Sequence, residues 1–203
     1  MSGAVQVGVE LKVFLLSPAS LEGVRGRLLR SRRASFAAAR QLRRPEGAPI
    51  GEVFAFLSAL YFRGKLAYAR RFAAGTPEQP GVLVIAPGFG LVEADWALTR
   101  ERLDRMRAVG VDIRRRAYRR PVEEHARALA AAVGEAGRCI LLGSLATGKY
   151  LDLLAPLLGE RLLVPRRFVG LGDMSRGSIL LRAAQSGEEL EYFAAGELPA
   201  RRR

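Results

Sequence analysis

The sequence predicts a single α/β domain, residues 1–203, with a mostly parallel sheet of about five strands and helices on both faces. Short apolar runs alternate with helical patterns along the chain, and the connections between them are short. A chain of 203 residues with 49% hydrophobic side chains can also bury a core of its own. In such folds ligands bind at the carboxyl ends of the strands, so we look for a site there.

The first element is an apolar run at residues 11–16 (LKVFLL), which Ser17-Pro18 stops; it predicts a buried strand. Residues 20–44 then interleave small or apolar side chains with arginines. This pattern predicts either one long basic helix or two short ones.

Residues 50–73 have apolar side chains near helical spacing, at Val53, Leu57, Leu60 and Ala67. They predict a helix. We therefore expect residues of about 20–73 to form a basic helical insertion between the first and second strands.

The rest of the chain continues the alternation. Further strands are predicted at residues 82–86, 111–114, 139–142 and 162–164, and further helices at 98–109, 122–133 with Pro121 as first residue, and 149–158 with an interruption at Pro156.

Basic side chains outnumber acidic ones by 33 to 20, and they are clustered in residues 20–44 and in residues 114–120 (RRRAYRR). Clustered positive charge binds polyanions, so we expect a nucleic acid, DNA or RNA, as the partner. A merely solvated basic surface is the competing interpretation. The candidate nucleic-acid contacts are Arg30, Arg33, Arg40, Arg63, Lys65, Arg115, Arg116 and Arg119.

Aromatic side chains are interleaved with these basic ones, at Tyr61, Phe62, Tyr68, Phe72 and Tyr118. Aromatic rings can stack on unpaired bases. Core packing of an amphipathic helix explains the same pattern equally directly.

One cysteine, Cys139, and one histidine, His125, exclude an internal disulfide and a Cys/His zinc site. Cys139 is expected to be buried packing and His125 a partly exposed surface residue. No apolar run approaches membrane-spanning length and the N-terminus does not resemble a signal peptide. We expect a cytoplasmic protein with no membrane contact, no metal and no cofactor.

Residues 143–149 have the GxxxxGK spacing of a phosphate loop between a strand and a helix. Tyr150 stands where a nucleoside triphosphatase needs Ser or Thr for magnesium, which argues against hydrolysis of a triphosphate. Backbone N–H groups in this turn could still hold an anion. We take Ser144, Lys149 and Tyr150 as candidate phosphate ligands and a small nucleotide as a possible ligand.

Residues 87–95 (PGFGLVEAD) follow the second strand and combine glycines with acidic side chains. Close backbone approach at Gly88, Phe89 and Gly90 would form part of a binding pocket; a simple chain-reversing turn is the alternative. Glu93 and Asp95 are candidate catalytic groups.

Residues 164–181 mix small and polar residues and are interpreted as a functional loop. They add Asp173 to the candidate carboxylates, and Arg176 as an anion binder. Paired carboxylates of this kind suit chemistry at an N-glycosidic bond, with Asp95 as acid/base. A hydrolase or transferase for nucleosides or bases is therefore the alternative function. A scaffold that binds a protein partner through residues 50–73 is a third.

Three segments in order resemble those of the YaaA-like proteins. The strand with APGFGLVEAD resembles their SA-(K/R)-YGL segment, the strand with GSLATGKYLDLL resembles their glycine-rich stretch, and VPRRFVGLGDMSRGSILL resembles their closing P…GLG segment. The opening LLSPAS is also similar.

The resemblance covers about half of the chain and implies a small α/β protein associated with DNA binding and peroxide stress. It implies nucleic-acid contact through Phe89, Gly90, Tyr150 and Gly172. Pro87-Gly88 departs from the small-basic pair of the pattern, and we expect the arginine-rich segments 25–44 and 114–120 to take over that contact.

Overall fold

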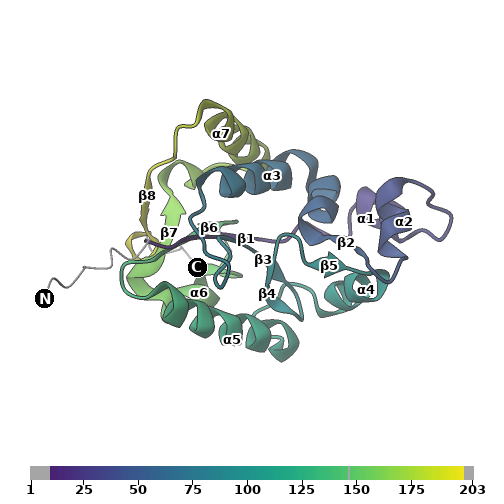
Figure 1. The fold of residues 1–203 in the computed structure, drawn as a ribbon, viewed down its shortest axis with the longest axis horizontal. Coiled ribbons are helices and arrows are strands. Elements are labelled where there is room, and N and C mark those ends of the chain that lie inside the picture. Colours follow the sequence, from purple (N-terminus) through teal and green to yellow (C-terminus); the bar gives the residue numbers. More distant parts are fainter. Residues whose placement is uncertain (1–9, 146, 199–203) are drawn as a thin grey trace, which may run out of the picture.

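A six-stranded sheet forms the centre of the protein in a computed structural model that describes residues 10–145 and 147–198 (Figure 1). Its strand order is β4-β3-β1-β6-β7-β8. The four inner strands are parallel, and both edge strands are antiparallel to their neighbours. The strands are β1 (Lys12–Leu16), β3 (Val82–Ala86), β4 (Gly90–Glu93), β6 (Arg138–Leu142), β7 (Leu162–Pro165) and β8 (Tyr192–Ala194).

Helices cover both faces of this sheet, as Figure 1 shows. On one face lie α3 (Ile50–Phe72) and α7 (Asp173–Ser186), which pack against each other. On the other lie α5 (Arg116–Val133) and α6 (Leu151–Leu158). The predicted α/β class with a mostly parallel sheet is confirmed.

Only the first part of the predicted basic insertion, residues 20–44, forms a small layer at one end of the molecule, whereas α3 covers the sheet (Figure 1). This layer contains two short helices, α1 (Val24–Arg30) and α2 (Ala37–Leu42), rather than one long helix. A two-stranded ribbon of β2 (Ala48–Pro49) and β5 (Ala97–Leu98) lies beside it, and α4 (Arg100–Val109) follows β5. We call residues 23–44 the α1–α2 hairpin below.

Two predicted elements differ from the structure. Residues 111–114 form a turn and not a strand, because Asp112 accepts from the backbone N–H of Arg114 and closes the chain on itself. The following helix begins at Arg116, so Pro121 lies inside α5 and not at its first position. Its buried face of Val122, Ala126, Leu129 and Val133 is as predicted.

The C-terminal quarter is more regular than the predicted loop. Residues 164–181 complete β7, form the short 3₁₀ helix η2 (Arg166–Phe168) and begin α7. Two further 3₁₀ helices, η1 (Gly159–Arg161) and η3 (Ala195–Glu197), flank β7 and β8. The glycines of this segment did not indicate a helix in the sequence. Glycine is required where α3 and α7 meet, because a Cβ on Gly64 of α3 would lie 2.7 Å from the carbonyl oxygen of Gly177 of α7.

A sharp kink divides α3. Ala59 has φ 38° and ψ −99°, a conformation that non-glycine residues rarely adopt, and the helix continues in a new direction beyond it. The second part of the helix, from Leu60 onward, runs along α7 and over the sheet. The kink thus positions Tyr61 and Lys65 against the end of β1, where Lys65 contacts Ser17.

Candidate functional site

The chain leaves the central strands in opposite directions at their carboxyl ends. The connection after β1 crosses the face covered by α3, whereas the connection from β4 to β6 and the connection after β6 cross the face covered by α5 and α6 (Figure 1). Neighbouring loops diverge at such a point and leave a crevice between them. The sheet therefore offers its natural ligand site beside the end of β1.

A cavity of about 420 Å³ lies at this edge of the sheet, a volume within the range of small-ligand sites. Its walls combine the segments after β1, β3 and β6 with parts of α3, α4 and α7. We call it the carboxyl-end pocket. Its lining residues are Pro18, Ala19, Ser20, Leu21, Glu22, Phe54, Pro87, Met106, Arg107, Gly110, Val111, Lys149, Tyr150 and Asp173.

Behind one wall of this pocket lies a buried lysine. Lys65 is 1% exposed, and its Nζ donates to the Ser17 carbonyl oxygen at 2.5 Å and to Ser17 Oγ at 2.9 Å. The rings of Tyr61 and Phe62 lie 4.6 and 4.7 Å from the same nitrogen. Lys65, a predicted nucleic-acid contact, therefore does not lie on the exposed basic surface, because the kinked helix turns it into the interior.

Burial lowers the pKa of Lys65 to about 7, since the charged ammonium loses its hydration. Asp173 opposes this shift and Arg176 adds to it. Burial also raises the pKa of Tyr150 to about 12, against a hydrogen bond with the Ser17 side chain that lowers it. Ser17 thus links Lys65 to Tyr150, which lines the pocket.

A second buried cation approaches from α7. Arg176 is 5% exposed, and its nearest carboxylate is Asp173, with Nη1 and Oδ1 3.6 Å apart. Asp173 is 68% exposed and lines the pocket. Within residues 10–145 and 147–198, two buried side-chain atoms have no hydrogen-bond partner, Arg176 Nε and Tyr61 Oη. Both belong to this buried group, which we call the buried cation cluster: Ser17, Tyr61, Lys65, Tyr150 and Arg176.

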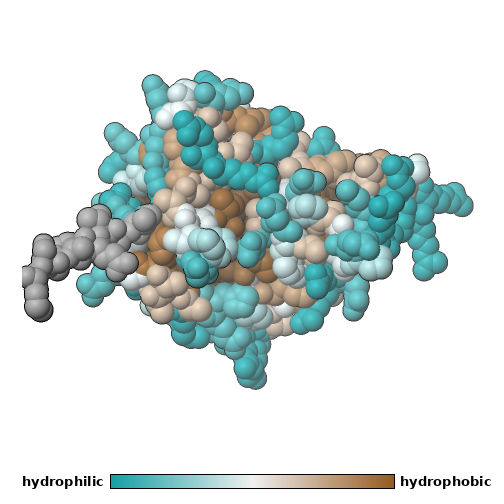
Figure 2. Space-filling view, viewed as in Figure 1, coloured by the Kyte–Doolittle hydropathy of each residue, from teal (hydrophilic) through white to brown (hydrophobic). Residues whose placement is uncertain are grey.

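The α1–α2 hairpin begins at the pocket rim, directly after Leu21 and Glu22. Among the described residues none of its eight arginines forms an ion pair; they are Arg25, Arg27, Arg30, Arg32, Arg33, Arg40, Arg43 and Arg44. Hydrophilic side chains cover this end of the molecule in Figure 2. The hairpin is therefore a surface of positive charge whose arginines are not ion-paired with carboxylates of the described residues.

The hairpin arginines have two kinds of environment. Five donate to backbone carbonyl oxygens of the hairpin, of the preceding residues 21 and 22 or of α3, which anchors them: Arg25, Arg27, Arg30, Arg40 and Arg43. Arg32, Arg33 and Arg44 are exposed and make no such bond in the described part of the chain. Of the predicted contacts Arg30, Arg33 and Arg40, only Arg33 therefore has a guanidinium free of carbonyl oxygens.

The second arginine cluster, residues 114–120, is largely neutralised. Arg114 pairs with Asp112 at 2.9 Å, Arg119 with Glu123 at 3.4 Å and Arg120 with Glu124 at 2.6 Å. Arg115 caps α4 by donating to the carbonyl oxygens of Ala108 and Val109. Arg116 is exposed, as is Arg63 on α3.

The glycine segment after β3 reverses the chain. Gly88 and Gly90 have φ of 82° and 87°, and a Cβ on Gly90 would lie 2.7 Å from His125 Nδ1, so both positions require glycine. Phe89 packs against Trp96, with the ring centroids 5.1 Å apart, and the Arg105 guanidinium lies 4.8 Å from the Phe89 ring centroid. Gly88, Phe89 and Gly90 thus form the turn between β3 and β4, and they are absent from the lining of the carboxyl-end pocket.

The predicted catalytic carboxylates do not meet. Because β4 runs antiparallel to β3, with Glu93 opposite Leu83, Glu93 and Asp95 lie toward the amino end of the parallel strands. Asp95 is exposed and pairs with Arg70 at 2.8 Å. Asp173 lies at the opposite end, on the carboxyl-end pocket. The expectation that these three carboxylates share one crevice is therefore wrong.

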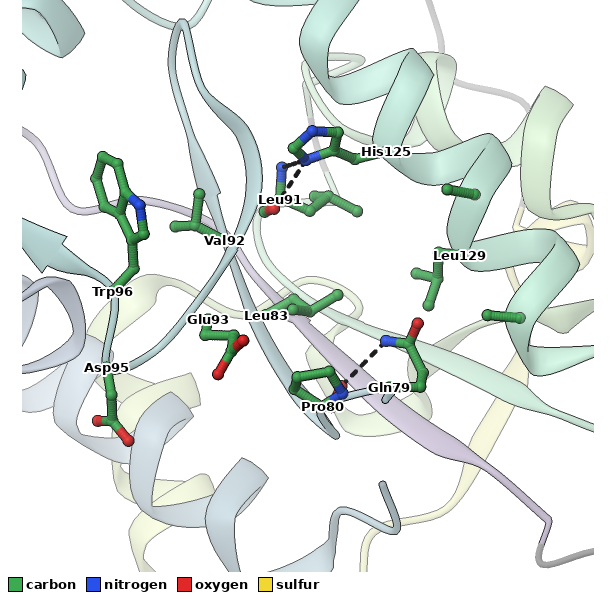
Figure 3. A pocket seen from close by; sticks show the side chains of 12 residues that line it. Gln79, Pro80, Leu83, Leu91, Val92, Glu93, Asp95, Trp96, His125 and Leu129 are labelled. Atoms are coloured by element: carbon green, nitrogen blue, oxygen red, sulfur yellow. Dashed lines mark hydrogen bonds between the residues drawn. The ribbon is translucent and has the colours of Figure 1, made fainter. Parts of the chain in front are cut away.

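Glu93 and Asp95 border a different cavity, a groove of about 620 Å³ between β4 and α5 (Figure 3). His125 lies at its margin, where Nδ1 is 3.0 Å from the Leu91 amide nitrogen and 2.9 Å from the Leu91 carbonyl oxygen. The groove is lined mainly by apolar side chains such as Leu83 and Leu129. His125 therefore contacts the backbone of the edge strand.

The candidate stacking rings are mostly core. Tyr61, Phe62, Tyr68 and Tyr118 are buried, and Phe72 packs against Tyr68 with the ring centroids 4.7 Å apart. The core-packing interpretation is correct for these side chains. The free face of α3 that a protein scaffold would need is likewise occupied, by α7 and the sheet.

The glycine-rich turn after β6 borders the pocket. Lys149 is exposed and lines it, Tyr150 is buried beside it, and Ser144 is half-buried. Ala146, within this turn, lies outside the described residues. Across the described chain no three His, Cys, Asp or Glu side chains gather as metal ligands. No helix of that same part is long and apolar enough to cross a membrane.

Sequence reasoning missed the contact between Ser17 and Lys65. A signal existed: Lys65 is one of three lysines in an arginine-rich chain, and it lies within the apolar and aromatic segment 61–68 (YFRGKLAY). The kink at Ala59 left no such signal, since alanine is a good helix former.

Comparison with known proteins identifies no relative. No family model matches the chain, and neither a curated protein nor a solved structure matches it. The resemblance to the YaaA-like proteins stays a prediction.

Proposed function

We propose that this protein binds nucleic acid, with phosphates held by the α1–α2 hairpin and a terminal nucleotide or base in the carboxyl-end pocket. One observation carries the proposal: the arginines of the hairpin have no carboxylate partners among the described residues, and the hairpin starts at the rim of the pocket. A polyanion that binds there releases condensed counterions, which favours association. This agrees with the resemblance to YaaA-like proteins and with a cytoplasmic location.

The pocket adds features that suit a nucleotide. Phe54, Met106 and Val111 provide apolar contact for a base, and Lys149 and Arg107 provide positive charge at its walls. Arg107 lies 3.8 Å from Glu22, an exposed and weak pairing. The alternative N-glycosidic enzyme is not proposed, because Glu93 and Asp95 lie at the other end of the sheet from Asp173.

Binding to labelled single-stranded and double-stranded oligonucleotides across a salt series tests the proposal. The informative variant is the triple change Arg32→Glu, Arg33→Glu and Arg44→Glu, since these guanidinium groups make no backbone hydrogen bonds that anchor the fold within the described residues. We expect it to bind much more weakly. Each lost phosphate contact lowers the slope of log affinity against log salt by about 0.9 on duplex DNA or about 0.7 on a single strand.

The matched control changes Arg116, Arg119 and Arg120 to Glu, which alters the net charge by the same amount. Two of these arginines are already paired with Glu123 and Glu124, so we expect a smaller loss of affinity. If the hairpin variant melts like the parent and keeps the parental salt slope, the hairpin is a solvated surface and the proposal is wrong.

A further inference from the structure

When Lys65 is protonated, the buried cation cluster carries more positive charge than its surroundings balance. Lys65 and Arg176 are both almost fully buried, and Asp173 is the one carboxylate of the described chain that acts on both. Burying an ammonium or guanidinium group without a carboxylate partner is costly, because the charged group loses its hydration. A second negative group in this place would remove that cost.

The cluster also contains donors that are not used. Tyr61 Oη and Arg176 Nε are buried, and neither makes a well-formed hydrogen bond to the described residues. The two side chains are neighbours, since burial raises the pKa of Tyr61 to about 12 and Arg176 opposes that rise. Buried donors in native proteins are almost always paired, and an unpaired one is expected where a ligand or ion supplies the acceptor. Tyr61 and Arg176 lie beside the close contact of α3 with α7, where a Cβ on Gly177 would lie 2.9 Å from Tyr61 Cα.

Asp173 stands between this cluster and the carboxyl-end pocket. It is the first residue of α7, its side chain is 68% exposed, and its carboxylate lies 3.6 Å from Arg176 Nη1, longer than a direct hydrogen bond. The same residue lines the pocket together with Tyr150 and Lys149. A rotation of this exposed side chain toward solvent would open Arg176 to an anion in the pocket.

We propose that Arg176, Lys65 and Tyr61 bind the terminal phosphate monoester of the nucleotide or nucleic acid that occupies the carboxyl-end pocket, with Asp173 as the internal counter-ion that the phosphate displaces. The inference rests on the proposed function. A terminal phosphate carries a charge of about −1.5 to −2 at neutral pH and three acceptor oxygens, which matches two cations and two unused donors. A phosphate within a chain has sugars on both sides and cannot enter a buried corner.

The test compares oligonucleotides of one sequence that carry a 5′-phosphate, a 3′-phosphate or only hydroxyl ends. We expect one phosphorylated end to bind about tenfold more tightly or better, the gain of one or two charge-assisted hydrogen bonds. Equal affinity for all three overturns the inference and leaves the proposed function standing.

Variants refine the test. Asp173→Asn removes the competing carboxylate without disturbing the core and should increase the preference for the phosphorylated end, whereas Arg176→Gln should abolish it. Arg182→Gln, an exposed arginine on the same helix, is the matched control and should leave the preference unchanged. A preference that Asp173→Asn leaves unchanged or reduces contradicts the role of Asp173 and overturns the inference.

A nucleoside monophosphate separates the two proposals. If no oligonucleotide binds the wild-type protein but a nucleoside monophosphate raises its melting temperature, and the parent nucleoside does not, the phosphate site stands and nucleic-acid binding is wrong. If neither oligonucleotide nor monophosphate binds, both proposals are wrong.

Discussion

Lys65 and Arg176 beneath the carboxyl-end pocket and the arginines of the α1–α2 hairpin carry the same charge in opposite surroundings. The first two are almost fully buried, and one of them is held by Ser17. The hairpin arginines are mostly exposed, and three of them contact neither a carbonyl oxygen nor a carboxylate in the described residues. In water an exposed guanidinium costs the fold almost nothing, whereas a buried ammonium loses its hydration.

This difference in exposure determines the distance over which each region can attract a ligand. Exposed, unpaired arginines attract a polyanion over a distance and lose this attraction as salt rises. Buried cations are screened little by salt and act on a group that reaches them. The hairpin therefore suits affinity for any nucleic acid, and the cluster suits selection of a particular chemical group.

The largest expected effect concerns Lys65 and pH. Its pKa is lowered by burial to about 7 in the folded protein, against its ordinary value of 10.5, so between these values the unfolded chain holds one more proton. The free energy of unfolding should therefore rise with pH, by up to about 1.4 kcal/mol per pH unit from this group. In Lys65→Met this contribution should disappear.

Urea unfolding between about pH 7 and about pH 9.5 gives the slope of the unfolding free energy against pH for wild type and for Lys65→Met, and the difference between the two slopes is the contribution of Lys65. Wild type alone is not enough, because burial raises the pKa of Cys139 to about 12 and this thiol lowers the stability as the pH rises above the ordinary thiol pKa. Cys139 is present in both proteins, so its contribution cancels in the difference. Lys149→Met, which removes an exposed lysine, should keep the wild-type slope. An unchanged slope in Lys65→Met would mean that Lys65 keeps an ordinary pKa.

A smaller effect is expected from the helix contact that holds the cluster together. In Gly177→Ala the new Cβ would lie 2.9 Å from Tyr61 Cα and 3.0 Å from the Leu60 carbonyl carbon, both backbone atoms. The helices must move apart, and we expect a loss of about 1–3 kcal/mol in the free energy of unfolding. Calorimetric or urea unfolding gives the value.

Gly196→Ala is the control for this change, since a Cβ there meets nothing within 4 Å. It should alter stability by less than about 0.5 kcal/mol. Gly177→Ala should weaken the preference for a phosphorylated end while leaving the salt slope of oligonucleotide binding unchanged. A changed salt slope would show that the two regions are not independent.

The smallest effect on stability is expected in the hairpin itself. Neutralising Arg32, Arg33 and Arg44 to Gln should change the free energy of unfolding by no more than about 0.5 kcal/mol, because their exposed side chains make no hydrogen bonds to the rest of the described chain. Arg30→Gln should cost more, since the half-buried Arg30 donates to the Leu21 carbonyl oxygen. Thermal unfolding of both variants distinguishes a solvated group from an anchoring one.

Local pattern predicted the buried strands and the long helices well. The apolar runs at residues 82–86 and 139–142 are strands, and Val122 and Leu129 lie on a buried helix face as their spacing indicates. Such elements bury continuous or periodic apolar surface, which the sequence displays directly.

Placement of charges was not predictable in the same way. The clusters at 20–44 and 114–120 read alike, yet Glu123 and Glu124, one helical turn further on, pair with the second cluster. The antiparallel return of β4 took Glu93 away from the expected crevice. Lys65 became part of the site through a backbone kink and a partner, Ser17, far away in the sequence. Each of these outcomes depends on contacts between distant segments.

The pairing of β1 with β6 also has a meaning for how the chain acquires its structure during translation. Lys12 pairs with Arg138 and Leu16 with Leu142, so the central strand gains one of its two neighbours only after most of the chain has left the ribosome. Until then the apolar edge of β1 is unpaired, a state in which strands associate with the wrong partners. At a synthesis rate of about 5–20 residues per second, this exposure lasts for several seconds. During that interval the hairpin is already synthesised, and its net positive charge favours repulsion between chains over association.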